Sequence, residues 1–158
     1  MFRDSGVTVW CGCDHVVRGI PEPVEVQGFP GSRSCDDAAM ALGVLIVDDH
    51  ASFRRMAGLL LITAGFEVVG EAADAGSAIA AVARLRPDAV LLDVMLPDRC
   101  GVEVARELAA QCDPPRVVLT SSRSQSDFAQ SYGWPGGCKY IAKHELTGAA
   151  LTALLREA

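Results

Sequence analysis

The ten residues Asp88-Ala-Val-Leu-Leu-Asp93-Val-Met-Leu-Pro97 decide the fold. The apolar run from Ala89 to Leu92 reaches Asp93 without a polar break, and Pro97 ends any regular pairing soon afterwards. Such a run is too short for a helix and apolar on both faces, which indicates a strand buried inside a parallel sheet. The Asp93 carboxylate then lies at the carboxyl edge of that sheet, where open α/β folds bind their ligands.

The same alternation of strands and helices continues on both sides of this stretch. Further strand-like runs occupy 44–47, 66–70, 116–119 and 138–142, and helical patterns occupy 53–63, 74–85, 102–108, 124–132 and 145–157. Strands that alternate with helices of this length predict a parallel, doubly wound α/β sheet with helices on both faces. For five units we expect the flavodoxin-like strand order 2-1-3-4-5.

Local signals define several of the helices. Gly65 suits the position after the first helix, Asp74 is expected to cap the second, and Pro87 ends it. The predicted inward side chains of the first helix are those of Phe53, Met56, Leu59, Leu60 and Thr63. Those of the last helix are Leu146, Ala150, Leu151, Leu154 and Leu155.

Composition and charge exclude several classes of function. The 158 residues carry a net charge of −6 and no basic run, which argues against a direct nucleic-acid surface. No segment has the roughly 18 consecutive apolar residues of a membrane span, and the amino terminus lacks the apolar core of a signal peptide. We therefore expect a cytoplasmic protein with reduced cysteines that does not contact the membrane.

Residues 1–41 are predicted to form a separate, disordered arm, and 42–158 to form the folded domain. Proline, glycine and serine interrupt the arm, and its short apolar runs at 7–10 and 24–26 have no evident sheet partner. Cys11, Cys13, His15 and Cys35 do not have the spacing of a zinc knuckle, so exposed thiols are the preferred interpretation. A further hypothesis is that translation starts at Met40.

Polar residues follow four of the predicted strands. Asp48 and Asp49 follow the first strand, Asp93 the third, Thr120 the fourth and Lys143 the fifth. Since the carboxyl ends of parallel strands share one edge, these groups should converge on a single crevice. Carboxylates about 4 Å apart repel by roughly 4 kcal/mol per pair at an effective dielectric near 20, and one lysine cannot neutralise three of them. This oxygen-rich set suits Mg²⁺ better than zinc.

With these residues the sequence resembles the receiver (CheY-like) domains of bacterial two-component response regulators. The resemblance covers 43–158 and includes the order and spacing of its motifs. They are Val44-Leu-Ile-Val-Asp48-Asp49, Leu91-Leu-Asp93-Val-Met-Leu-Pro97, Gly101, Val117-Val-Leu-Thr120-Ser121 and Tyr140-Ile-Ala-Lys143. Asp-Asp-His and Gly70-Glu-Ala72 look most like receivers of the NarL/FixJ class. Because the chain stops after the last helix, we expect a stand-alone receiver.

The resemblance implies a phosphorelay switch. Asp93 would accept a phosphoryl group from a sensor histidine kinase or a histidine phosphotransfer protein. Mg²⁺ would bind to Asp49, Asp93 and the backbone carbonyl of Met95, and to Asp48 through water. Lys143 and Thr120 would contact the phosphoryl oxygens, and Thr120 and Tyr140 would form a switch pair. The output would be a contact with an unknown downstream protein, and the only catalysis would be assistance to the domain's own phosphorylation and dephosphorylation.

Three alternatives remain open. A binding module could keep this fold and work without phosphorylation, although the intact acidic set, Thr120 and Lys143 speak against it. A phosphohydrolase of related topology usually needs a second acid two residues after the nucleophile, where this sequence has Met95. His144 could relay a phosphoryl group, but an exposed histidine at a helix start is the preferred interpretation.

Overall fold

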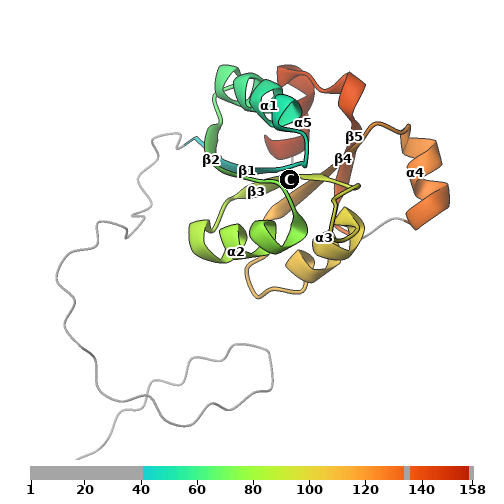
Figure 1. The fold of residues 1–158 in the computed structure, drawn as a ribbon. Coiled ribbons are helices and arrows are strands. Elements are labelled where there is room, and N and C mark those ends of the chain that lie inside the picture. Colours follow the sequence, from blue (N-terminus) through green and yellow to red (C-terminus); the bar gives the residue numbers. More distant parts are fainter. Residues whose placement is uncertain (1–40, 134–135, 157–158) are drawn as a thin grey trace, which may run out of the picture. The chain divides into compact units, whose positions relative to one another are not determined.

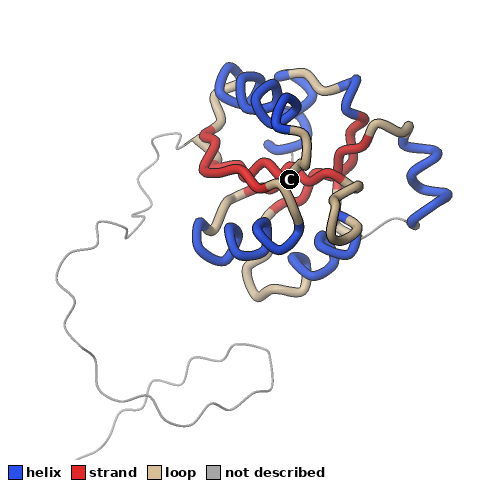
Figure 2. The backbone as a smooth tube through the Cα atoms, in the orientation of Figure 1, coloured by secondary structure: helices blue, strands red, loops and turns tan. Residues whose placement is uncertain are grey.

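A parallel five-stranded sheet forms the centre of the protein. The structure is a computed structural model that describes residues 41–133 and 136–156. Within them the strand order is β2-β1-β3-β4-β5, and every pairing is parallel. Figure 2 shows these strands in red, with the helices in blue around them. The strands are β1 (Gly43–Val47), β2 (Glu67–Ala72), β3 (Ala89–Asp93), β4 (Arg116–Ser121) and β5 (Lys139–Ala142). The predicted fold class and strand order are confirmed.

Helices cover both faces of this sheet. α1 and α5 lie on one face, α2 and α3 on the other, and α4 lies beyond β5 (Figure 1). The helices are α1 (Ala51–Thr63), α2 (Ala75–Leu85), α3 (Gly101–Ala109), α4 (Gln125–Tyr132), α5 (Gly148–Arg156) and the short 3₁₀ helix η1 (Lys143–Glu145). None of the helices within the described residues is long and apolar enough to cross a bilayer.

Alternate residues of the central strands fill two separate cores. In β1, Val44 and Ile46 join the core under α1 and α5, whereas Leu45 and Val47 join the core under α2 and α3. All residues of β1 and β3 are buried, as expected for strands covered on both faces. This arrangement holds the carboxyl ends of the two strands rigidly side by side.

The predicted caps of the first two helices are confirmed. Gly65, just after α1, has φ +84°, a conformation that glycine adopts without strain. The Asp74 side chain accepts a hydrogen bond from the backbone N–H of Ser77 at 2.7 Å and so caps α2. Asp98 adds a cap that was not predicted: its carboxylate accepts bonds from the backbone N–H groups of Ala75 and Gly76. The loop after Asp93 is thereby tied to the start of α2.

The inward face predicted for α1 is wrong in part. Met56 and Leu59 are 42% and 68% exposed, whereas Leu61 is fully buried. The exposed side chains also include Thr63, the buried residues include Ala57 and Gly58, and Phe53 and Leu60 are half-buried. Ala57 and Gly58 are small enough to let the helix approach the sheet closely, so they take the central positions. A run apolar on all sides, from Leu59 to Ile62, offers no periodicity that could have selected the face.

Several predicted boundaries also differ, among them those of the last helix and the second strand. The last helix was expected to begin at Glu145, but the chain first forms η1, and α5 begins at Gly148. Leu146, between them, is nevertheless buried as predicted. The second strand runs from Glu67 to Ala72 instead of 66–70, because its register shifts where β1 passes from Val44 to Leu45.

Several predictions concern residues outside the described part of the chain. They include the disordered arm, the short strands at 7–10 and 24–26, the Cys11, Cys13, His15 and Cys35 interpretation, and the start at Met40. The division into an arm at 1–41 and a domain at 42–158 stays a prediction.

Candidate functional site

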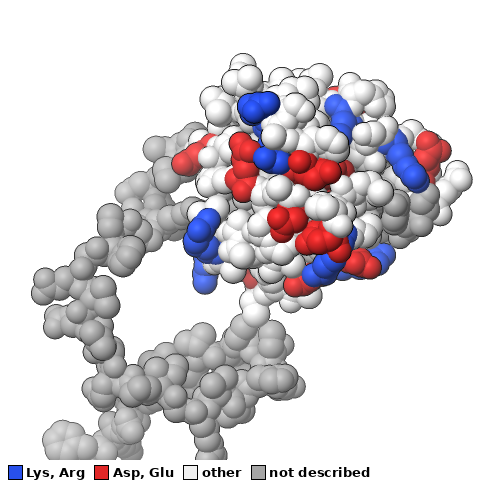
Figure 3. Space-filling view, viewed as in Figure 1, with Lys and Arg blue, Asp and Glu red and all other residues white. Residues whose placement is uncertain are grey.

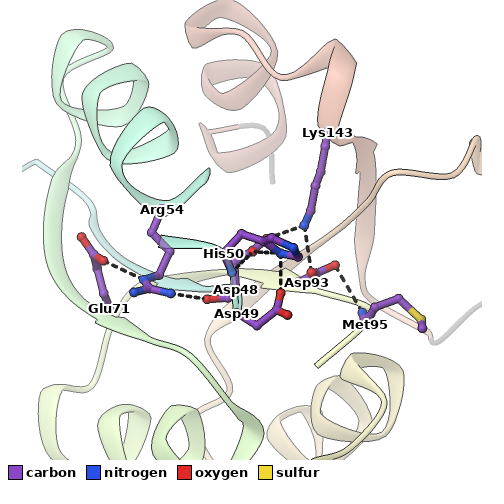
Figure 4. A network of polar contacts seen from close by, with 8 residues as sticks. All are labelled: Asp48, Asp49, His50, Arg54, Glu71, Asp93, Met95 and Lys143. Carbon is purple, nitrogen blue, oxygen red and sulfur yellow. Dashed lines mark hydrogen bonds and ion pairs between the residues drawn. The ribbon is translucent and has the colours of Figure 1, made fainter. Parts of the chain in front are cut away.

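The polar residues that follow the strands meet at the carboxyl edge of the sheet. Asp48 directly follows β1, Asp93 is the last residue of β3, and Lys143 directly follows β5. Thr120 lies in β4 and pairs in register with Asp93. Figure 4 shows the acids and Lys143 pointing toward one another. These side chains therefore converge on one edge of the sheet, as predicted.

Lys143 joins the two buried carboxylates. Its Nζ lies 2.5 Å from Asp48 Oδ2 and 2.8 Å from Asp93 Oδ2. Asp48 is fully buried and Asp93 is 3% exposed, so water screens these charges weakly. The ammonium also stands 4.6 Å from the centre of the Phe53 ring, a cation–π contact from α1. The lysine is thus held over the site by groups from three elements.

Asp49 and His50 form the exposed side of the site. Asp49 Oδ1 lies 2.6 Å from His50 Nδ1, and Asp48 Oδ1 lies 3.4 Å from the same nitrogen. One ligand atom from each of Asp48, Asp49, His50 and Asp93 falls within 4.8 Å of all the others. Sequence reasoning treated the ligands as an oxygen set and did not consider His50. The signal available was its place directly after the acid pair.

Arg54 supports the site from the first turns of α1. Its guanidinium donates to the backbone carbonyl of Asp48 at 2.6 Å and to Glu71 Oε2 at 2.8 Å. The arginine thereby fixes the strand end that carries the acid pair against β2. This residue was also missed, because nothing in its spacing distinguishes it from an ordinary exposed arginine.

The loop after Asp93 is held close to the carboxylate. The backbone N–H of Met95 donates to Asp93 Oδ1 at 3.2 Å. A Cβ at Gly101 would stand 2.0 Å from the backbone oxygen of Asp93, so only glycine fits there. Met95 itself is 56% exposed. That the Met95 carbonyl is a ligand of Mg²⁺ stays a prediction.

The predicted switch residues, Thr120 and Tyr140, lie in the neighbouring strands β4 and β5. The Thr120 hydroxyl is fully buried and has no hydrogen-bond partner among the described residues. The Tyr140 ring is buried and stacks on Phe128 of α4, with 4.8 Å between the ring centres. Its hydroxyl donates to the backbone carbonyl of Arg123 at 2.5 Å. An unsatisfied buried hydroxyl is costly, which makes Thr120 a candidate donor to an incoming group.

Burial and charge act in opposite directions on the ionisable groups. Burial raises the pKa of Asp93 above its ordinary value, and the nearby charge of Asp48 adds to this, while Lys143 opposes it. For Lys143, burial opposes the charged form. The hydrogen bonds to Asp48 and Asp93 outweigh that effect, and the pKa of Lys143 is raised. The site therefore keeps its lysine charged while Asp93 is held in an unfavourable surrounding for an anion.

The residues present fit a hard divalent cation. Three carboxylates face a single lysine, and Arg54 is occupied by Glu71 and a carbonyl. Acidic side chains also gather in the middle of the face shown in Figure 3. Carboxylate oxygens are the ligands that Mg²⁺ prefers, and a cation would offset the remaining negative charge.

Comparison with known proteins identifies the family. A model of the response regulator receiver domain matches residues 44–156. The chain belongs to the receiver domain family of response regulators. It is thus a signalling domain of the kind found in two-component systems. The predicted resemblance is confirmed.

Mycobacterial regulators are among the proteins similar to this receiver domain. The transcriptional regulatory protein PdtaR of Mycobacterium tuberculosis is 37% identical over 113 residues, which are 72% of this chain and 55% of PdtaR. The DNA-binding response regulator MtrA of Mycolicibacterium paratuberculosis is 43% identical over 86 residues, which are 53% of this chain and 37% of MtrA. The chain thus spans about half or less of these relatives.

The fold is likewise similar to a solved receiver. The structure of the signal receiver domain of NarL from Mycobacterium tuberculosis superimposes with a TM-score of 0.62 at 28% identity. The match covers 72% of this chain and 96% of that domain. The likeness therefore extends over nearly the whole NarL receiver.

Proposed function

We propose that this receiver domain is a phosphorylation switch that accepts a phosphoryl group on Asp93 from a histidine kinase or a histidine phosphotransfer protein. The observation that carries the proposal is the contact of Lys143 with both buried carboxylates at the sheet edge, 2.5 Å from Asp48 and 2.8 Å from Asp93. The membership of the chain in the receiver family supports this assignment.

Each residue of the site has a role in the proposed transfer. An Asp93 carboxylate oxygen forms the new P–O bond while the P–N bond of the phosphohistidine donor breaks and its electrons return to the imidazole. Asp49, Asp93 and the Met95 carbonyl would hold Mg²⁺, and Asp48 would bind it through water. Mg²⁺ supplies charge neutralisation for the phosphoryl oxygens. Lys143 pairs with a second oxygen, and the Thr120 hydroxyl donates a hydrogen bond to a third.

Phosphorylation would then alter a surface beside β5. The phosphoryl group adds about two negative charges, and the Thr120 hydroxyl moves to meet it. Thr120 and Tyr140 act as the switch pair through the segment between β4 and α4. Tyr140 is well placed for this role because its hydroxyl holds the Arg123 carbonyl and its ring supports Phe128 of α4. The resulting change favours or disfavours binding of a downstream protein.

Incubation with Mg²⁺ and a small phosphodonor, such as acetyl phosphate, tests the proposal. Intact-mass spectrometry should find one added phosphoryl group on the wild type, absent from Asp93→Asn and absent when the metal is chelated. Lys143→Met should lower the phosphorylated fraction without abolishing folding. An unmodified wild-type protein under conditions that label a known receiver would contradict the proposal.

The same experiment addresses the alternative of a phosphorylation-independent binding module. In that case neither the donor nor Asp93→Asn would change the affinity for a partner recovered with the protein. A purified cognate kinase would extend the test, since transfer from its phosphohistidine should label Asp93 faster than the small donor does.

A further inference from the structure

His50 is placed at the acidic site in a way that helix capping does not explain. It is the N-cap residue of α1, yet its side chain makes no capping hydrogen bond. Serine, threonine, aspartate and asparagine cap helices far better. The backbone N–H of His50 donates to Asp48 Oδ1 at 2.8 Å. The imidazole ring itself lies against the carboxylates. The imidazole therefore contacts the acidic site and does not cap the helix.

The position of the ring nitrogen is that of a potential ligand. Nδ1 lies 2.6 Å from Asp49 Oδ1. A ring nitrogen of His50 also belongs to the set of four ligand atoms within 4.8 Å of one another. Figure 4 shows the ring among Asp48, Asp49 and Asp93. The side chain is 68% exposed, so solvent reaches its other face. A neutral imidazole carries its proton on either ring nitrogen, so Nδ1 can bind a metal when the proton is on Nε2.

We propose that His50 is an additional ligand of the metal at this site, and that its imidazole makes the site prefer a divalent transition-metal ion, such as Mn²⁺ or Co²⁺, over Mg²⁺. The inference rests on the proposed function, because it assumes that a cation binds between Asp49 and Asp93. Mg²⁺ gains little from a nitrogen ligand, whereas the affinity of mixed nitrogen and oxygen sites rises from Mn²⁺ to Co²⁺. Together with the carboxylates of Asp49 and Asp93 and the Met95 carbonyl, the imidazole would form such a mixed set.

Isothermal titration calorimetry with MgCl₂, MnCl₂ and CoCl₂ on the full chain tests the inference. His50→Gln should weaken Co²⁺ and Mn²⁺ binding by about 10-fold or more, the range seen when residues supporting metal sites are changed, and leave Mg²⁺ binding within twofold. His144→Gln is the matched control, because its side chain is also 68% exposed and it lies outside the ligand set. That variant should bind all three ions as the wild type does.

Electron spin-echo spectroscopy of the Mn²⁺ complex provides a direct readout. The wild type and His144→Gln should show coupling to an imidazole nitrogen, and His50→Gln should not. Equal weakening of all three ions in His50→Gln, or a wild-type spectrum without nitrogen coupling, would show that the ring only supports Asp49 and would overturn the inference. Either result would leave phosphorylation of Asp93 intact. A wild type that binds none of the ions and accepts no phosphoryl group would overturn the proposed function as well.

Discussion

Asp93 is expected to lower the stability of the metal-free protein at neutral pH. Because the pKa of Asp93 is raised by burial and by Asp48, the folded state holds the Asp93 proton more tightly than the unfolded chain does. The contribution of this group is therefore most favourable below the ordinary pKa of aspartate and is lost as the pH rises through the folded-state pKa. Asp93→Asn should then raise the free energy of unfolding at neutral pH, because it removes a poorly solvated charge while Asp48 still pairs with Lys143.

Urea unfolding of both proteins in a chelator, at a series of pH values, measures this effect. The gain from Asp93→Asn should be smallest at acidic pH and should grow to a plateau above the folded-state pKa. A gain independent of pH, or a loss of stability at neutral pH, would contradict the explanation by burial.

Lys143 is expected to stabilise the folded protein, because its ammonium pairs with the two buried carboxylates. Its side chain joins Asp48 and Asp93, so Lys143→Met leaves both without their described cation. Breaking a buried pair in this way costs about 3 kcal/mol of unfolding free energy. The double variant Asp93→Asn/Lys143→Met should recover part of that loss, because one uncompensated charge is removed. Thermal and urea unfolding of the three variants would test this, and purely additive effects would argue against the coupling.

At the scale of single elements, α1 shows how packing selects one face of an apolar helix. Leu61 is fully buried and Leu59 is 68% exposed, although they are two residues apart. Leu61→Ala should cost about 2 to 5 kcal/mol of unfolding free energy, whereas Leu59→Ala should change it by less than about 0.5 kcal/mol. Denaturant unfolding distinguishes the faces, since equal losses would mean that α1 is rotated from the described position.

The loop between β3 and α3 depends on a close approach of two backbone segments. A Cβ at Gly101 would meet the oxygen and carbon of the Asp93 backbone at 2.0 and 2.9 Å, and backbone atoms cannot yield as a flexible side chain does. Gly101→Ala should therefore cost about 2 to 4 kcal/mol and should also impair phosphorylation, because the loop carries Met95.

Gly58→Ala is the control for that substitution. Its added Cβ would have only Ile46 Cδ1 nearby, at an ordinary contact distance of 3.7 Å. As an interior residue of α1, it should stabilise the protein by up to about 1 kcal/mol. Equal effects of the two substitutions would indicate that the Gly101 loop has freedom which the structure does not show.

Across the whole molecule, contacts of Tyr140 connect the sheet beside the site to α4. Phe128 is the buried residue among the described side chains of α4, and it stacks on Tyr140. The Tyr140 hydroxyl holds the carbonyl of Arg123, which follows β4. A helix with one buried side chain among those described is expected to open at low free-energy cost, so α4 and the segment before it are the expected moving part.

Hydrogen–deuterium exchange with Mg²⁺ and beryllofluoride, a mimic of the phosphoryl group, tests that expectation. Exchange rates should change in 121–142 and remain unchanged in α2, which is capped by Asp74 and Asp98. Asp93→Asn should show no change in either segment. A response confined to the immediate surroundings of Asp93 would mean that Tyr140 does not transmit the signal.

The apolar runs and their order along the chain were enough to predict the sheet and its strand order. They also predicted the five polar side chains at or next to the strand ends. The reason is that a strand buried on both faces leaves an unmistakable apolar run, and parallel strands must end at one edge. Asp48, Asp49, Asp93, Thr120 and Lys143 could therefore be placed together before any coordinates were known. Their roles in phosphorylation stay predictions that the experiments above address.

Packing between elements sets which side of α1 is buried and where α5 begins. It also brings the side chains of His50 and Arg54 close to the acids. These features depend on how side chains of different elements fill a shared space, and no local period records that. The face of α1 was set by the small residues that permit close packing on β1. The His50 ring lies against Asp49 and Asp48, close to Asp93 at the end of β3.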